Sequence, residues 1–280
     1  MKVQIKNVKD LVSKSNLPTC DFVINPYVGC PHGCKYCYAS FMKRFSGHLE
    51  EWGTFIDIKQ CENPINTKKL EHHSVFLSSV TDCYNAYEAT YCVTQNTLKQ
   101  LIGIDCELGI STKSSLILRD IELLKQCKNV RVSMSINTLD EQFKEDMDQA
   151  SSIQDRLHTL KTLHEQGIYT ILFMSPIFPG ITDYQKIMET SKEYIDEFWF
   201  ENLNLRGSYK QTVLSYIDEK YPHLHDVYQR IYVKKDMTYW KELSLDIAQY
   251  CENNNIQYTN YFYHEELVKK TKHLKQKHFE

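Results

Sequence analysis

The chain has 280 residues, of which 42% are hydrophobic and 25% charged, and its formal net charge at neutral pH is −3. This composition is typical of a globular protein and does not favour a disordered chain, while the small negative charge gives no overall attraction to nucleic acid. The first residues lack the apolar run of a secretory signal, and no stretch approaches the roughly 20 apolar residues of a membrane span. We therefore expect a cytoplasmic protein whose ten cysteines are reduced.

Three of the cysteines lie close together in the stretch NPYVGCPHGCKYCYA, residues 25–39. Cys30, Cys34 and Cys37 follow the spacing CxxxCxxC, and an odd number of cysteines on such a short loop argues against disulfides. Structural zinc usually takes four ligands, and no second CxxC pair is present; ferredoxin-type clusters use four cysteines in other spacings. The triplet suits a four-iron cluster with one iron open to a ligand, with zinc as the alternative. We expect His32, inside the triplet, to be a solvated loop residue, with a hydrogen bond that tunes the cluster as the alternative.

Basic residues surround this loop. Lys35, Lys43 and Arg44 are present, whereas residues 31–49 contain no acidic side chain. Because opposite charges steer partners together, the segment predicts a docking face for an acidic partner, with chance clustering as the alternative.

The middle of the chain alternates between short apolar runs and segments with helical periodicity. Helix-compatible segments separate the first four runs, and a fifth run closes the series. The runs are 74–82, 107–114, 129–137, 169–180 and 198–207. Strands that alternate with helices predict an α/β fold with a parallel sheet, open or barrel-like, whose ligands bind at the carboxyl ends of the strands. Function should therefore collect near Thr81, Lys113 and Ser135.

The pattern changes near Gly207. Two helices are expected at 210–221 and 237–253, then an aromatic strand at 256–264 and a lysine-rich tail, VKKTKHLKQKH. We predict an N-terminal extension (1–19), a core (20–206) and a mostly helical C-terminal appendage (207–280) that covers the core. The tail is expected to be a solvated end, with a site for an anionic partner as the alternative.

The cysteine motif resembles the CxxxCxΦC signature of the radical S-adenosylmethionine (radical SAM) enzymes, with Tyr36 as the aromatic Φ beside the cofactor. The resemblance implies a partial (β/α)6 TIM-like barrel and a 4Fe–4S cluster on Cys30, Cys34 and Cys37. It implies that the open iron binds the amino and carboxylate groups of S-adenosylmethionine, and that the reduced cluster cleaves this cofactor to a 5′-deoxyadenosyl radical. That radical would abstract hydrogen from a substrate the sequence does not name. A reductant such as flavodoxin or ferredoxin is also implied.

Within that family the chain resembles the spore photoproduct lyase-like branch over roughly residues 20–205. The resemblance lies in the cysteine stretch, in STKS at 111–114, in SIN at 135–137 and in DRLHTL at 155–160. It implies that Thr81 touches the methionine moiety, that Lys113 and Arg156 approach the cofactor carboxylate, and that Ser135 lies near the ribose. The plainer alternative for such residues is a helix cap or a surface ion pair.

The chain also departs from that branch. The lyases carry a hydrogen-donating cysteine at the position of Val80, and the next cysteine here is Cys83. Cys83 is a candidate hydrogen donor, with a buried structural thiol as the alternative. Two rival functions remain: a lyase acting on DNA photolesions, and a non-enzymatic, metal-stabilised protein that binds nucleic acid.

Overall fold

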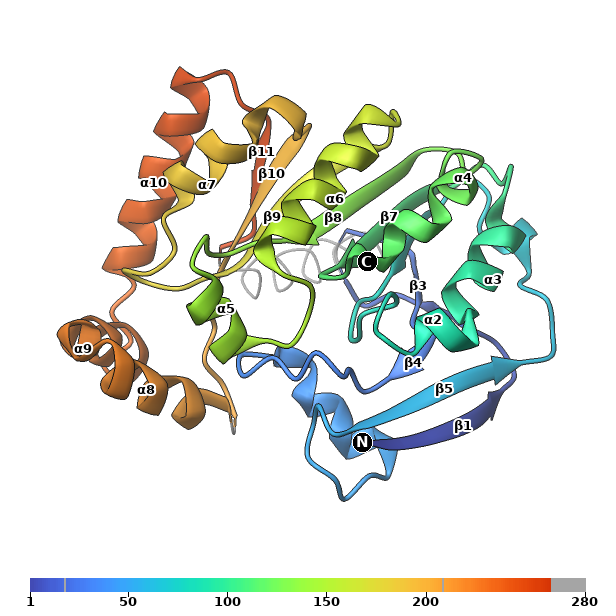
Figure 1. Ribbon diagram of the computed structural model, residues 1–280, viewed down its shortest axis with the longest axis horizontal. Coiled ribbons are helices and arrows are strands. Elements are labelled where there is room, and N and C mark those ends of the chain that lie inside the picture. Colours follow the sequence, from blue (N-terminus) through green and yellow to red (C-terminus); the bar gives the residue numbers. More distant parts are fainter. Residues whose placement is uncertain (18, 208, 263–280) are drawn as a thin grey trace, which may run out of the picture.

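The computed structural model describes residues 1–17, 19–207 and 209–262 (Figure 1). Its main sheet has eight strands in the order β11-β10-β9-β8-β7-β6-β3-β2, and all neighbours are parallel except β2 and β3. The strands are β2 (Val12–Lys14), β3 (Phe22–Ile24), β6 (Ser74–Leu77), β7 (Glu107–Thr112), β8 (Val130–Ser135), β9 (Tyr169–Ile177), β10 (Glu197–Asn202) and β11 (Tyr258–Asn260). The predicted α/β class is confirmed, and within the described ranges the sheet is open, as expected of a partial barrel.

Helices connect successive strands and cover the outer face of the sheet (Figure 1). The α-helices up to β10 are α1 (Lys43–Ser46), α2 (Glu88–Tyr91), α3 (Val93–Leu101), α4 (Ile121–Leu124), α5 (Glu141–Met147), α6 (Ile153–Glu165) and α7 (Tyr184–Ser191). The shorter turns are η1 (Tyr38–Met42), η2 (Thr67–Lys69), η3 (Ser115–Asp120) and η4 (Lys192–Tyr194). The helix expected after β7 is mostly the 3-10 turn η3, and the one expected after β6 breaks at Cys92, where φ is +51°.

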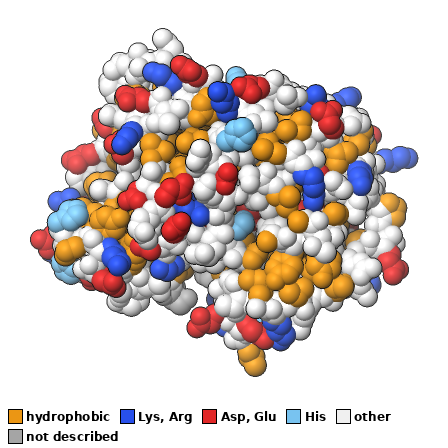
Figure 2. Space-filling model, viewed as in Figure 1, with side chains coloured by type: hydrophobic (Ala, Val, Ile, Leu, Met, Phe, Trp, Pro, Cys, Tyr) orange, Lys and Arg blue, Asp and Glu red, His pale blue; other side chains and the backbone are white. Residues whose placement is uncertain are grey.

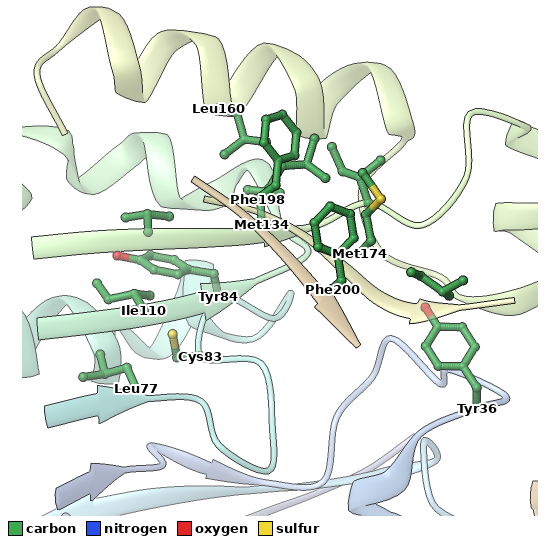
Figure 3. Close-up of a cluster of buried hydrophobic side chains, with 14 of the residues drawn as sticks. Tyr36, Leu77, Cys83, Tyr84, Ile110, Met134, Leu160, Met174, Phe198 and Phe200 are labelled. Carbon is green, nitrogen blue, oxygen red and sulfur yellow. The ribbon is translucent and has the colours of Figure 1, made fainter. Parts of the chain in front are cut away.

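The strands of the main sheet are amphipathic, so one face of the sheet packs in the core and the other lines a cavity. In β8, Val132 and Met134 belong to the apolar core, whereas Ser133 and Ser135 line a cavity on the inner face. Figure 3 shows Met134 and Met174 beside Leu160 of α6, in the apolar core between sheet and helices. Because side chains alternate along a strand, one face builds the core and the other remains for ligands.

A second sheet of three strands lies beside the cysteine loop. Its order is β1-β5-β4, with β1 (Lys2–Val8) parallel to β5 (Phe55–Cys61) and β4 (Tyr27–Val28) antiparallel to β5. Val3 and Ile5 of β1 are exposed. Figure 2 shows apolar side chains gathered on the lower part of the molecular surface in that view. The residues expected to form an N-terminal extension thus supply β1 to this sheet and β2 to the main sheet.

The C-terminal segment contains the two expected helices and adds a strand to the main sheet. It consists of α8 (Tyr209–Lys220), η5 (Pro222–Leu224), α9 (His225–Tyr228), the π-helical turn η6 (Gln229–Val233), α10 (Thr238–Asn253) and β11. Strand β11 pairs in parallel with β10, with Tyr258 opposite Phe198. The boundary at Gly207 stays a prediction, and the lysine-rich tail lies outside the described residues.

A search of the described helices finds none with both the length and the apolar composition needed to cross a bilayer.

Candidate functional site

The loop that carries Cys30, Cys34 and Cys37 runs from β4 to η1 and is fixed on both sides. Gly29 has φ +87°, and a Cβ there would lie 2.4 Å from the carbonyl oxygen of Phe55 in β5, so only glycine turns the chain this close to β5. On the other side, the Lys35 amide donates to the carbonyl of Met147 at 2.9 Å. The loop is therefore fixed between β5 and the C-terminal end of α5.

The three thiols share one cavity and one electrostatic environment. Burial raises the pKa of each thiol, to about 12 for Cys34; the pKa of Cys30 is also raised by the Asp82 carboxylate and the other two cysteines. Buried thiols of this kind stay protonated unless a metal binds them as thiolates. Thiolates are the ligands that iron–sulfur clusters require, so this donor set fits such a cluster.

The arrangement of possible metal ligands in the described residues gives no support to a site for a single metal ion. Among the residues that the structure describes, no three Cys, His, Asp or Glu side chains converge closely enough to hold a single metal ion.

The structure brings four more predicted residues to the same cavity as the cysteines. Tyr36, Thr81, Lys113 and Ser135 all line it. The Thr81 hydroxyl donates to the Gly29 carbonyl at 2.6 Å, and the Lys113 ammonium lies 5.9 Å from the centre of the Tyr36 ring. Lys113 follows β7 and Ser135 ends β8, so parallel strands deliver them side by side, at the edge where such sheets bind ligands.

Arg156 is held elsewhere. It lies in α6, its exposed fraction is only 2%, and it does not line the cavity. Its guanidinium pairs with the Asp148 carboxylate at 2.5 Å and donates to the carbonyls of Ser135 and Ser151. In this structure Arg156 therefore lies outside the cavity and stabilises its wall through these contacts, and its guanidinium does not face the cavity.

Cys83 is also outside the cavity. Its side chain is fully buried, and its amide donates to the Ser78 hydroxyl at 2.7 Å. Figure 3 shows it in the core beside Leu77 and Tyr84. The chain turns directly after β6 and directs this thiol toward the helices, which is the position of a structural cysteine, and no hydrogen-donor role is proposed for it.

Asp82 connects the cysteine loop to the strand ends, and sequence analysis missed it. Its carboxylate accepts from the Thr112 hydroxyl at 2.8 Å and from the Lys113 amide at 2.7 Å, and it lies 3.0 Å from Nε2 of His32. Burial works to raise its pKa, but His32 and the hydrogen bonds outweigh burial and lower the pKa to about 2. The expectation that His32 is solvated is wrong, because its side chain is buried against this carboxylate. The rule that function collects at strand ends could have found Asp82.

Asp148 is the second residue that the sequence did not reveal. It follows α5 and accepts from the Tyr36 hydroxyl at 3.1 Å as well as from Arg156. Burial works to raise its pKa, but the charges of Arg156 and Lys113 outweigh this and lower it. A buried carboxylate thus links the aromatic residue of the cysteine motif to α6.

The cavity has a volume of about 1440 Å³ and extends from the cysteines along the inner faces of the strands. Residues 24–192, more than half of the chain, match the family model of the radical SAM superfamily. The chain belongs to the radical SAM superfamily. The cofactors of this family are a 4Fe–4S cluster and S-adenosylmethionine, as the sequence predicted.

Two relatives identified by sequence are an uncharacterized protein and a protein named as a radical SAM enzyme. An uncharacterized protein of Methanocaldococcus jannaschii is 34% identical over 229 residues, which cover 81% of this chain and 87% of that protein. A radical SAM Nalpha-GlyT isomerase of Pseudomonas phage M6 is 27% identical over 166 residues, 58% of this chain and 34% of the phage protein.

Two solved structures share the fold of this radical SAM protein. Spore photoproduct lyase complexed with dinucleoside spore photoproduct matches with a TM-score of 0.55 at 17% identity, over 79% of this chain and 66% of the lyase. Streptococcus suis SuiB bound to S-adenosylmethionine matches with a TM-score of 0.54 at 17% identity, over 85% of this chain and 49% of SuiB. The chain thus spans less than two thirds of either protein. The predicted resemblance to the lyase-like branch is confirmed for the fold.

Proposed function

We propose that this chain is an enzyme that binds its cluster through Cys30, Cys34 and Cys37, cleaves S-adenosylmethionine beside it, and abstracts hydrogen from a substrate in the cavity. The observation that supports this proposal is the presence of the three thiols, Lys113 and Ser135 in one cavity at the carboxyl ends of the strands. When bound and reduced, the cluster would supply the electron that breaks a carbon–sulfur bond of S-adenosylmethionine, giving methionine and a 5′-deoxyadenosyl radical.

The residues of the chain would bind and orient that cofactor. The Lys113 ammonium is held near Tyr36 and would pair with the carboxylate of the methionine moiety. The Lys113 amide donates a hydrogen bond to the Asp82 carboxylate, and this contact fixes the backbone from which the lysine side chain extends. The Ser135 hydroxyl would contact the ribose, and the apolar parts of Tyr36 and Val80 would exclude water from the reacting bond.

Replacing either cofactor residue by alanine should weaken cofactor binding while keeping the cluster. We expect Lys113→Ala and Ser135→Ala each to cost about 1–3 kcal/mol, because each removes a hydrogen bond in a buried site. Equilibrium binding of S-adenosylmethionine to the reconstituted protein measures this effect. The control is Ser111→Ala, which removes a hydroxyl from the same cavity two residues earlier in β7 and should leave the affinity unchanged. Wild-type affinity in both test variants would show that the cofactor binds elsewhere.

The reductant is proposed to be an acidic electron-transfer protein such as flavodoxin or ferredoxin. Lys43 and Arg44 lie at the cavity and Lys35 lies beside the Tyr216 ring, in a segment without acidic side chains from residue 31 to 49. These charges would attract an acidic surface toward the cysteine loop. Binding of nucleic acid is not part of the proposal, because the lysine-rich tail that would support it lies outside the described residues.

Repair of spore photoproduct is the second candidate, because the fold resembles that of the lyase. The resemblance assigns Val80 to the position of the lyase thiol, and Val80 lines the cavity, so a hydrocarbon side chain would occupy the place of the hydrogen donor.

A single assay tests both functions. The protein, reduced anaerobically with dithionite, should convert S-adenosylmethionine to 5′-deoxyadenosine even without substrate. With an oligonucleotide that carries the lesion, we expect close to no thymine restored per 5′-deoxyadenosine released. Val80→Cys is the matched variant, since it adds a thiol to the cavity at the lyase position. A ratio near one in the unmodified protein would make it a lyase, whereas no 5′-deoxyadenosine despite a complete cluster would refute the proposed function.

A further inference from the structure

The turn that leads into β5 packs directly on the cysteine loop. Gly53, two residues before this strand, has φ +95°, and a Cβ there would lie 3.0 Å from the Cα of Gly33. Gly33 lies between Cys30 and Cys34. Because only glycine combines this backbone conformation with so close an approach, the contact places the residue before Gly53 beside the triplet.

That residue is Trp52, whose ring rests on an aromatic stack. Its side chain is half-buried, and it packs edge-on against Phe55 of β5, with ring centres 5.7 Å apart and planes at 86°. Phe55 is fully buried and stacks on the His48 ring, with ring centres 3.9 Å apart and planes at 17°. The indole is therefore held by side chains that have no room to move.

Charged groups anchor the far side of this stack. His48 lies 2.8 Å through Nε2 from the Asp57 carboxylate of β5 and 3.1 Å through Nδ1 from the Glu50 carboxylate. Asp57 also pairs with Lys6 of β1 at 2.6 Å. Strands β1 and β5 and the loop before β5 thus share one network, which makes the three-stranded sheet a rigid platform under Trp52.

Trp52 makes its polar contact with one of the proposed cluster ligands. Its side chain hydrogen-bonds Cys37, and since an indole has a single polar atom, an N–H that only donates, the sulfur is the acceptor. Burial raises the pKa of the Cys37 thiol, and the hydrogen bond from Trp52 is the largest effect that opposes burial. Trp52 does not line the cavity, so this contact is separate from those proposed for the cofactor.

We propose that Trp52 sets the reduction potential of the cluster through its hydrogen bond to Cys37. This inference rests on the proposed function, because it requires a cluster that Cys37 binds. Reduction adds negative charge to the cluster and its sulfur ligands, so a donor to one of those sulfurs stabilises the reduced state more than the oxidised state. Trp52 would therefore raise the potential and make electron transfer from the reductant more favourable.

Trp52→Phe tests this role, because it keeps an aromatic ring against Phe55 and removes the donor. We expect the equilibrium constant for reduction of the cluster to fall about tenfold, a potential about 59 mV more negative for one electron. A redox titration of the reconstituted protein, followed by the electron paramagnetic resonance of the reduced cluster, measures the shift. Trp199→Phe is the matched control, because its buried indole N–H has no hydrogen-bond partner among the described residues, and it should leave the potential unchanged.

A second measurement needs no variant. Protein that carries nitrogen-15 in its tryptophan indoles is reconstituted and reduced, and pulsed electron paramagnetic resonance detects nuclei that couple to the cluster. We expect coupling to one indole nitrogen in the unmodified protein. The signal should persist in Trp199→Phe and disappear in Trp52→Phe, which a merely structural role of Trp52 would not produce.

The outcomes separate this inference from the proposed function. A complete cluster with the same potential in Trp52→Phe, an equal shift in Trp199→Phe, or no coupling to an indole nitrogen would each overturn the role of Trp52 and leave the proposed function standing. Absence of a cluster from the unmodified protein would refute the proposed function and this inference with it. Iron analysis of the same preparations distinguishes the two failures.

Discussion

Replacing Cys30, Cys34 or Cys37 by alanine should abolish the iron–sulfur cluster and, with it, the cleavage of S-adenosylmethionine. Each cysteine would bind a different iron of the cluster and leave the fourth iron to the cofactor, so the loss of one leaves too few ligands. We expect about four irons per chain in the unmodified protein after anaerobic reconstitution and a small fraction of that in each variant. Iron and sulfide analysis, with the visible absorption of the cluster, measures the effect.

The fold should survive these three substitutions. The core between sheet and helices is built from apolar side chains that do not include Cys30 or Cys37, and Cys34 only packs against it. Circular dichroism and the thermal midpoint of the metal-free protein should therefore stay close to those of the unmodified chain. Cys61→Ala is the matched control, since this half-buried cysteine at the end of β5 is far from the triplet in sequence and should leave the iron content unchanged. Full iron content in all three loop variants would refute the ligand assignment.

Asp148→Asn should destabilise the protein by about 3–5 kcal/mol, because it leaves the guanidinium of Arg156 as an unpaired charge in the interior. Both side chains are only 2% exposed, so water cannot replace the lost carboxylate. The Tyr36 hydroxyl would also lose its charged acceptor. Urea denaturation of the metal-free protein measures the change in the free energy of unfolding.

Two further variants separate the ion pair from general effects of substitution. Glu122→Gln breaks the exposed pair with Lys125 and should cost less than about 1 kcal/mol. The double variant Asp148→Leu, Arg156→Met should recover part of the loss, because apolar side chains can replace a buried ion pair. The recovery should be incomplete, since the carbonyls of Ser135 and Ser151 lose their donor. A cost below about 1 kcal/mol for Asp148→Asn would mean that water or rearrangement satisfies Arg156.

The alternation of strands and helices could be predicted because it is local. Runs such as 107–112 and 130–135 are apolar at every second position and precede segments with helical periodicity, which is sufficient to assign parallel strands. The location of Thr81, Lys113 and Ser135 followed from the rule that the carboxyl ends of parallel strands meet.

What could not be predicted depends on contacts between distant segments. Strand β1 pairs with β5, which lies far along the chain. A strand is expected at 256–264 and β11 lies within that range, but its pairing with β10 depends on residues that are distant in the sequence. The pairing of Asp148 with Arg156, and of His32 with Asp82, likewise depends on how separate loops pack. For Cys83, a turn after β6 decided whether the thiol faced the cavity or the core, and the sequence does not reveal the direction of that turn.

The order of the site residues along the chain has a consequence for engineering. The residues proposed to bind the cluster and the cofactor all precede β9, whereas Phe173, Trp199 and Tyr261, which also line the cavity, lie in β9, in β10 and directly after β11. A chimera that exchanges residues 169–262 with those of a relative would therefore replace these three aromatic side chains and keep every residue proposed to bind the cluster and the cofactor. Such a recombination must include β11, because this strand pairs with β10 and Tyr261 follows it. This part of the cavity wall is thus encoded in one contiguous piece of the gene.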